Sequence, residues 1–296
     1  MGINIFDLLQ VTIGGVAMGC IYALMALGFT IIYNALRLIN FAQGDMFMLG
    51  ATFGLTFYVS LSFPFPLALI AAGVVVGVIG MVIERTVFRP LRNYPLFNLI
   101  IATIGISITI RALALLIWGS QAMSFPPVYG DKPIKVGQII LLPSYLWVLL
   151  ISVMFIILLQ LFFTKTILGK AMRASAQNRN AAFLMGINVF FMDSLASAIS
   201  AGLGAVGGIL VAPIFFVETE MGALAGLKGF AAAVLGGFGS IPGAIAGGVI
   251  LGLAENLAAS LISSTYRDAV AFIILIGVLL LKPNGLLGKK AGDFKA

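Results

Sequence analysis

Nine long runs of apolar residues fill most of this chain, and they constrain its fold more than any other feature. In lipid, only helices and closed barrels satisfy the backbone N–H and C=O groups. Barrel strands alternate apolar and polar residues, whereas residues 69–83 show no alternation. We predict an all-α polytopic membrane protein, a compact glycine-rich bundle of about eight to ten transmembrane helices with short loops and one or two broken or re-entrant helices. The runs are residues 11–33, 46–61, 66–83, 96–118, 144–163, 189–211, 224–238, 243–262 and 266–281.

The composition agrees with this prediction. Of 296 residues, 61% are hydrophobic and 9% are charged, and the mean hydropathy is +1.15. A soluble domain is about half apolar and about a quarter charged, so a soluble globule is excluded. Spanning helices of about 20 residues leave little room for a domain outside the membrane, and we expect a single integral membrane domain, residues 1–296.

Glycine is abundant, and many of the 35 glycines lie four residues apart within the apolar runs. Small residues one helical turn apart let helix backbones approach closely in lipid. The spacing therefore indicates close helix packing within the bundle or in a dimer. The pairs are Gly15/Gly19, Gly73/Gly77, Gly204/Gly208, Gly243/Gly247 and Gly248/Gly252.

Positive charge predicts the orientation in the membrane. One set of loops holds most of the 17 Lys and Arg residues, and by the positive-inside rule that set is cytoplasmic. This places residues 165–179 and the tail, residues 282–296, in the cytoplasm, and residues 131–135 outside. The cytoplasmic set is Arg37, Arg85, Arg89, Arg92, Lys165, Lys170, Arg173, Arg179, Lys282, Lys289, Lys290 and Lys295.

Several kinds of chemistry are excluded by residues that the chain lacks. It has no His and a single Cys, Cys20, so we expect no catalytic residues, no metal site and no cofactor. An intramembrane enzyme would need a nucleophile with a base or two close carboxylates. No G-x-x-x-x-G-K-[ST] phosphate-binding loop is present, so ATP-driven transport would need an ATPase on another chain. The net charge of +7 fits cytoplasmic loops, and we expect lipid rather than nucleic acid as the charged partner.

Polar residues inside apolar runs are candidates for a transport path, because charge at membrane depth is costly. Polar, glycine-containing breaks interrupt the runs at residues 40–45 and 236–243, and interrupted helices often mark transport sites. Ordinary turns are the alternative, as are helix capping for Asp45 and Asp193 and structural pairing for Glu255 and Arg111. The predicted path residues are Asn40, Gln43, Asp45, Glu255 and Asn256.

The longest hydrophilic stretch on the predicted inner side, residues 164–188, is basic but carries apolar residues at its centre. Exposed apolar residues need cover, so we predict a short helix that docks on a partner. Ala181 and Ala182 would allow close approach, and Phe183 and Leu184 would fill the partner's groove. A loop that only anchors topology is the alternative. The predicted docking residues are Gly169, Arg173, Arg179, Ala181, Ala182, Phe183, Leu184 and Gly186, the last with a positive φ.

Motifs along the whole chain resemble those of branched-chain amino-acid ABC importer permeases of the LivH type. Residues 40–45 with Met48, Leu49 and Gly50 are similar to the family's N-F-A-H-G-E segment, with Gln43 and Asp45 in place of His and Glu. Residues 180–186 resemble its E-A-A-x-x-x-G coupling motif, with Asn180 in place of the acid. Further matching segments are residues 168–174, 232–244 and 283–288.

The resemblance implies a non-catalytic permease subunit of a bacterial ABC importer, multi-pass in the inner membrane. It would carry a small polar solute, most simply a branched-chain or related amino acid; a urea or short-chain amide permease is the alternative. The implied partners are a second homologous permease in a heterodimer, two cytoplasmic ATPase subunits, a periplasmic or lipid-anchored substrate-binding protein, and membrane lipid. An ion-coupled transporter that works alone is a further alternative, which the exposed Ala-rich loop disfavours.

Overall fold

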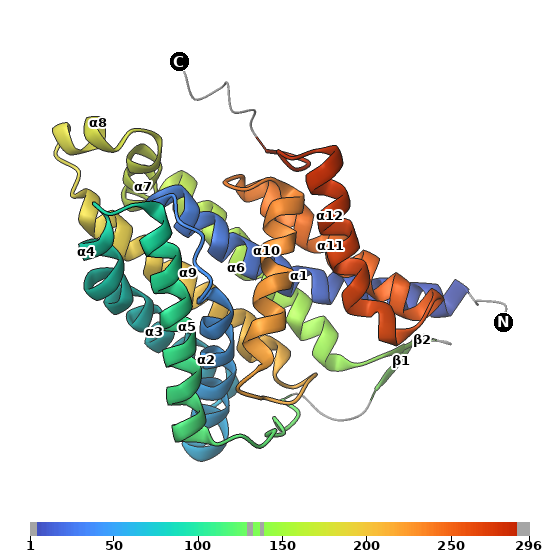
Figure 1. Ribbon diagram of the computed structural model, residues 1–296. Helices are drawn as coiled ribbons and strands as arrows, with labels where there is room; N and C mark the ends of the chain where they lie inside the picture. Colours follow the sequence, from blue (N-terminus) through green and yellow to red (C-terminus); the bar gives the residue numbers. More distant parts are fainter. Residues whose placement is uncertain (1–4, 129–132, 137–138, 289–296) are drawn as a thin grey trace.

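The computed structural model describes residues 5–128, 133–136 and 139–288, and each of the nine apolar runs is helical. Seven helices in these ranges, with α12 counted together with the 3-10 turn before it, are long and apolar enough to cross a membrane. Two others, α2 and α10, are shorter. The predicted all-α polytopic architecture is confirmed. The nine helices are α1 (Ile5–Leu36), α2 (Gln43–Leu55), α3 (Phe65–Ile83), α5 (Leu96–Trp118), α6 (Pro143–Lys165), α9 (Val189–Val211), α10 (Met221–Gly236), α11 (Ile241–Leu261) and α12 (Arg267–Leu281) (Figure 1).

Short elements connect these helices. The segment between α5 and α6 contains a hairpin that the sequence did not predict, in which β1 (Ile134–Val136) pairs antiparallel with β2 (Ile139–Leu141). The remaining elements are α4 (Arg89–Leu91), α7 (Ile167–Gln177), α8 (Arg179–Leu184), π-helical turns at Thr56–Ser60 and Glu84–Phe88, and a 3-10 turn at Ser264–Tyr266.

Helix α1 is the centre of the bundle. Every residue from Ala17 to Ile32 is buried, and α6, α9, α10 and α11 all pack on this helix. The predicted glycine contacts form here: a Cβ at Gly19 would lie 2.7 Å from Cα of Val249, and one at Gly252 would lie 2.3 Å from the backbone N of Gly19. Because these glycines lack side chains, the backbones of α1 and α11 come into direct contact.

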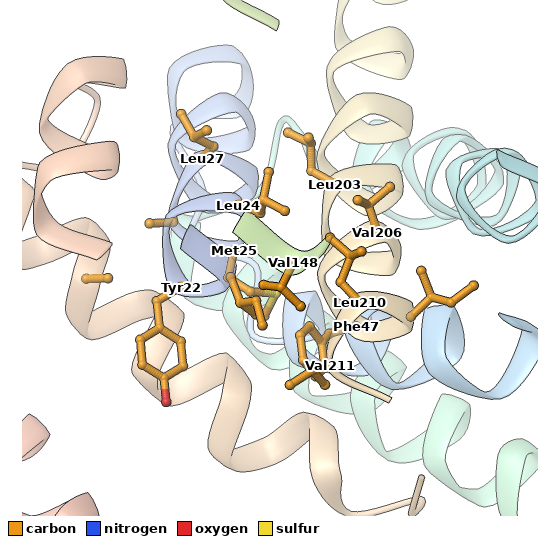
Figure 2. Packing of buried hydrophobic residues seen from close by; sticks show 14 of the residues in the cluster. Tyr22, Leu24, Met25, Leu27, Phe47, Val148, Leu203, Val206, Leu210 and Val211 are labelled. Carbon is orange, nitrogen blue, oxygen red and sulfur yellow. The ribbon is translucent and has the colours of Figure 1, made fainter. Parts of the chain in front are cut away.

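Aliphatic and aromatic side chains from α1, α2, α6 and α9 fill the core (Figure 2). Leu24, Phe47 and Leu203 come from three helices that are far apart in sequence, and each is buried. Figure 2 shows Tyr22 at the edge of this cluster, with its hydroxyl pointing away from the aliphatic side chains. A hydroxyl in this environment needs a polar partner, which lies in the ion-pair cluster described below.

Basic residues from distant parts of the sequence meet at one end of the bundle, which we call the basic end. This is the end where α1 and α12 finish and where α4, α7 and α8 lie (Figure 1). Arg37 donates to Ala176 O of α7 at 3.3 Å, and the pair Arg92 and Arg179 meets at Asp193. Of the predicted outer loop and cytoplasmic tail, residues 131–132 and 289–296 lie outside the described residues.

Helix α2 begins in the interior of the bundle rather than at its end. After α1 finishes, residues 38–42 run back non-helically, and Figure 1 shows α2 in the half of the bundle opposite the basic end. The Gln43 side chain at the start of α2 contacts Ser200, whose hydroxyl lies 2.7 Å from Gly28 O. Gly28 is eight residues, or about 12 Å, from the end of α1. The first predicted break is therefore a true interruption at depth.

The second predicted break, residues 236–243, is a tight turn between α10 and α11. Gly237 and Gly239 have φ of 105° and 90°, which glycine adopts without strain. The C-terminal segment covers this turn, since Leu286 N donates to Leu235 O and Leu287 N to Gly236 O, both at 2.9 Å. A Cβ at Gly237 would lie 2.3 Å from Gly288 N, so the close fit of the tail requires glycine here.

Candidate functional site

A cavity of about 240 Å³ lies between α2, α5 and α10, next to the interior start of α2. Asp45 and Arg111 line it together with apolar side chains, including Phe29 and Phe230. Ile104 on α5 and Leu227 on α10 are nearly half exposed, so the cavity opens at the surface of the chain between these two helices. A few polar groups in an otherwise apolar wall are typical of a small-molecule site.

Asp45 and Arg111 form an ion pair inside this cavity. The Asp45 Oδ1 to Arg111 Nε distance is 3.3 Å, and the two side chains are 3% and 31% exposed. Arg111 Nη2 donates to Ser107 Oγ at 2.9 Å, and Nη1 lies 3.6 Å from Oε2 of the exposed Glu220. Asp45 also lies in the first turn of α2, where a carboxylate interacts favourably with the helix dipole, although no side-chain hydrogen bond caps that helix.

Asn40 and Gln43 were predicted to line a path, and the structure places them in contacts that hold the interrupted segment. Asn40 Oδ1 accepts a hydrogen bond from Ala42 N at 3.1 Å. Gln43 Nε2 donates to Ser200 O at 2.9 Å, and the Ser200 hydroxyl lies 3.0 Å from Gln43 Oε1. Gln43 is fully buried. Asn40 therefore satisfies a backbone N–H of the non-helical segment, and Gln43 ties the start of α2 to the middle of α9.

Glu255 lies in a cluster of charges between α1, α10, α11 and α12 rather than in the cavity. Its side chain is fully buried, and Tyr22 donates to Oε2 at 2.6 Å. Lys228 pairs with Glu255 and also with Asp268, the second at a distance of 2.6 Å. Arg267 Nε lies 3.9 Å from Glu255 Oε2. The geometry favours the pairing alternative for Glu255.

Asn256 lies at the contact between α1 and α11. A Cβ at Gly14 would lie 3.4 Å from Asn256 Nδ2, and one at Gly15 would lie 3.3 Å from Asn256 Cβ. Asn256 therefore packs against glycines of α1. Among the five predicted path residues, Asp45 is the one that lines the cavity between α2, α5 and α10.

The predicted docking segment is two helices, α7 and α8, where one had been expected. Asn178 separates them, and its Oδ1 caps α8 by accepting from Ala181 N at 3.0 Å. Phe183, Leu184 and Met185 are 64%, 84% and 82% exposed. The segment thus presents three consecutive large apolar side chains at the basic end, which we call the apolar tip (Phe183, Leu184, Met185).

Two of the predicted roles in this segment need correction. Ala182 is 4% exposed, so it packs inside this chain and is not available for close approach to a partner. Gly169 was predicted as a docking residue, but it is buried within α7, where a Cβ would be 2.2 Å from Phe162 O. Both residues are therefore covered by their own chain, and at Gly169 the backbone of α6 leaves no room for a side chain. Gly186 has a φ of 83°, which confirms the predicted positive value.

Arg179 fixes α8 to the bundle. Its Nη2 lies 2.6 Å and its Nη1 3.3 Å from the two carboxylate oxygens of Asp193 on α9, and Arg92 pairs with the same carboxylate. The guanidinium groups of Arg89, Arg92 and Arg179 all lie within 5.9 Å of the Phe190 ring, a cation–π arrangement. By contrast, the Arg173 and Ala181 side chains are exposed.

Sequence reasoning missed several of these residues. Ser107 is four residues before Arg111 on α5, and that spacing on a helix could have indicated the contact. Met185 adjoins Phe183 and Leu184 and shares their exposure, which the apolar sequence at this point could have signalled. Glu220 and Tyr22 are joined to Arg111 and Glu255 only by the tertiary structure, and no local pattern marks them.

Comparison with known sequences decides the family of this chain. Residues 11–279 match the family described as branched-chain amino acid transport system / permease component. The chain belongs to this permease family. It is 35% identical to the high-affinity branched-chain amino acid transport system permease protein LivH of Salmonella typhimurium, over 95% of this chain and 96% of that protein. It is 36% identical to the corresponding permease protein BraD of Pseudomonas aeruginosa, over 97% of both chains.

The fold has a counterpart among solved structures. The chain superposes on PsaBC from Streptococcus pneumoniae in complex with Fab with a TM-score of 0.54, covering 95% of this chain and 94% of that chain. The sequences are 16% identical, so this likeness concerns the fold alone. Family membership and the seven long apolar helices within the described residues identify a multi-pass membrane protein of a transport permease family.

Proposed function

We propose that this chain is the permease subunit of a bacterial ABC importer that carries branched-chain amino acids across the inner membrane. The observation that carries the proposal is the match to permease proteins of branched-chain amino acid systems along nearly the whole chain. The subunit pairs with a second homologous permease, two cytoplasmic ATPase subunits and a periplasmic or lipid-anchored substrate-binding protein. ATP hydrolysis on the partners drives the permease pair between inward-facing and outward-facing states.

The path for the solute is the cavity between α2, α5 and α10. It opens at the surface of this chain, and the second permease closes that side. The interrupted segment before α2 supports this assignment, because non-helical backbone at membrane depth is tolerated where it is buried in protein or lines a cavity. The cavity is small enough to suit a single amino acid.

The coupling surface is the apolar tip together with the exposed Ile167 of α7. Three exposed apolar side chains in sequence at a basic end need a partner, and an ATPase groove provides one. Arg173 supplies a rim charge, which affects register more than affinity. Because the ATPases are cytoplasmic, this assignment also places the basic end and the C-terminus in the cytoplasm, in agreement with the positive-inside rule.

The transported solute is tested with the assembled transporter in liposomes. We expect ATP-dependent uptake of labelled leucine, isoleucine and valine that requires the substrate-binding protein. Urea and acetamide are the comparison solutes, since they represent the alternative substrate class. Uptake of urea or acetamide without leucine uptake would assign the chain to that alternative. Leucine uptake by this chain alone under an ion gradient would exclude the ABC assignment.

Coupling is tested with the double variant Phe183→Ala/Leu184→Ala. Burying a large apolar side chain contributes about 1.5–3 kcal/mol, so loss of two should reduce ATPase stimulation and uptake by about tenfold or more. The matched control is Val78→Ala on α3, an apolar residue that is 54% exposed and lies outside this surface. Unchanged stimulation in the double variant would identify the loop as a topological anchor or a lipid-facing segment.

A further inference from the structure

The cavity between α2, α5 and α10 contains opposite charges rather than a single charge. Asp45 is nearly fully buried, and Arg111 keeps about a third of its side chain accessible, at a separation of 3.3 Å. Arg111 Nε is buried and has no hydrogen-bond acceptor within the described residues. The pair is thus an ion pair without well-aligned hydrogen bonds, and a guanidinium with five N–H donors retains capacity for another acceptor.

Apart from the Ser107 hydroxyl and the exposed Glu220 carboxylate, which both lie next to Arg111, the surroundings of this pair are apolar. Phe29 on α1, Ile104 on α5, and Leu227 and Phe230 on α10 line the same cavity. A charge in such surroundings is stabilised only by a close opposite charge. A ligand that separates Asp45 from Arg111 must therefore give each of them a new partner of opposite charge. The rest of the ligand surface must be apolar.

A zwitterion with an aliphatic side chain meets both conditions. Its carboxylate offers two oxygens to the Arg111 guanidinium, the geometry in which arginine binds most strongly. Its ammonium offers N–H donors to the Asp45 carboxylate. A carboxylic acid without an amine would bind Arg111 and leave the buried Asp45 carboxylate unpaired, which is costly. An amine without a carboxylate would bind Asp45 and offer no acceptor to Arg111 in exchange.

We propose that Asp45 and Arg111 form the zwitterion-recognition site of the permease, in which Arg111 binds the α-carboxylate and Asp45 binds the α-ammonium of an amino acid. The ligand inserts between the two charges and exchanges their ion pair for two ligand contacts. Phe29, Ile104, Leu227 and Phe230 surround the aliphatic side chain. This inference rests on the proposed function, and it assigns the site and the chemical groups that the site reads.

The test measures occupancy of the cavity without relying on transport. Ile104→Cys is introduced into a Cys20→Ala background, because Cys20 is the single cysteine and is buried. Modification of the new thiol by a small methanethiosulfonate reagent is timed in the assembled transporter. We expect leucine to slow modification several-fold, while 4-methylpentanoate and 3-methylbutylamine, which each lack one of the two charges, give little protection.

The decisive variant is Asp45→Asn/Arg111→Gln, which removes both charges and leaves neither unpaired. We expect leucine protection to fall by about tenfold or more, because hydrogen bonds to charged groups contribute about that factor each. Arg111→Lys keeps the charge but loses the planar fork, and it should weaken protection to an intermediate degree. Co-purification with the partner subunits establishes that each variant is assembled.

The control is Glu84→Gln/Arg89→Gln, a pair with almost the same burial, 0% and 34% exposed, at the basic end. In this control variant, leucine should protect the Ile104→Cys thiol as well as it does in the parent transporter. Equal protection by all three ligands, or protection that survives in Asp45→Asn/Arg111→Gln, would overturn the proposed site. If the parent transporter imports leucine but the cavity is unprotected, the site fails and the proposed function stands. If the parent imports urea or acetamide instead, the proposed function fails.

Discussion

At the scale of single residues, glycines decide how closely the helices approach. A Cβ at Gly208 on α9 would lie 1.9 Å from Phe47 O of α2, and one at Gly50 would lie 2.2 Å from Cα of Ala205. Backbone atoms cannot move aside as a flexible side chain can. The position of α2 against α9, and with it the place of Asp45, depends on these missing side chains.

Gly208→Ala should therefore destabilise the protein, by about 1–3 kcal/mol as is usual for overpacking. The measurement is the thermal melting temperature of the detergent-solubilised complex. Gly105→Ala on α5 is the matched control, because within the described residues no heavy atom beyond its chain neighbours and the adjacent backbone of its own helix lies within 4 Å of its Cβ position. Equal melting temperatures for the two variants would show that the α2–α9 contact tolerates a methyl group.

At the scale of elements, hydrogen-bond caps set where helices begin. Thr166, Asn178 and Asn188 each accept a hydrogen bond from a backbone N–H in the first turn of α7, α8 and α9, as these residue types do at helix starts. Asn178 explains why the docking segment is two helices. Asp193 on α9 then holds α8 through Arg179 and holds the end of α4 through Arg92.

Asp193→Asn should loosen the attachment of α8 and reduce ATPase stimulation. It should have a smaller effect on the protection by leucine of the Ile104→Cys thiol in the cavity. It leaves two arginines without their carboxylate. Because these are 23% and 34% exposed, the loss of stability should be smaller than the about 3–5 kcal/mol seen for a fully buried pair. Asp7→Asn, at the exposed start of α1, provides the same chemical change away from α8. A parallel loss of stimulation and protection would argue for general unfolding.

At the scale of the whole molecule, charge and fold together divide the protein into two ends. Arg37, Arg92 and Arg179 come from separate loops and lie at the basic end, as the positive-inside pattern predicts for loops on one side of a membrane. At the opposite end the rings of Tyr58 and Phe125 stack, and the start of α12 places Arg267 and Asp268 in ion pairs with Glu255 and Lys228.

Single-cysteine labelling in a Cys20→Ala background tests this orientation. A cysteine at Gln121, which is exposed just beyond the end of α5, should react with an impermeant maleimide in intact cells. A cysteine at Tyr94, 58% exposed at the basic end, should react only after permeabilisation. The unmodified chain, which contains only the buried Cys20 thiol, measures the background labelling. The reverse pattern would invert the orientation.

The sequence by itself determined the helices, the class of the protein and several local features. Apolar runs specify spanning helices because lipid forces backbone hydrogen bonds to close within each segment. The interruption before α2 and the positive φ of Gly186 were also predictable, since both depend on residues adjacent in the chain. Asp45 could be predicted as a candidate path residue because it is a charged residue at the start of an apolar run.

Only the tertiary structure decided which charged residues pair and which side of a short helix faces outward. Asp45 pairs with Arg111 from α5, and Glu255 with Lys228 from α10, because helix packing brings these faces together and no local pattern records which faces meet. Ala182 and Phe183 are adjacent in a short helix, yet one is buried and the other exposed. Six residues are too few for a periodic stripe to indicate which side packs on the bundle.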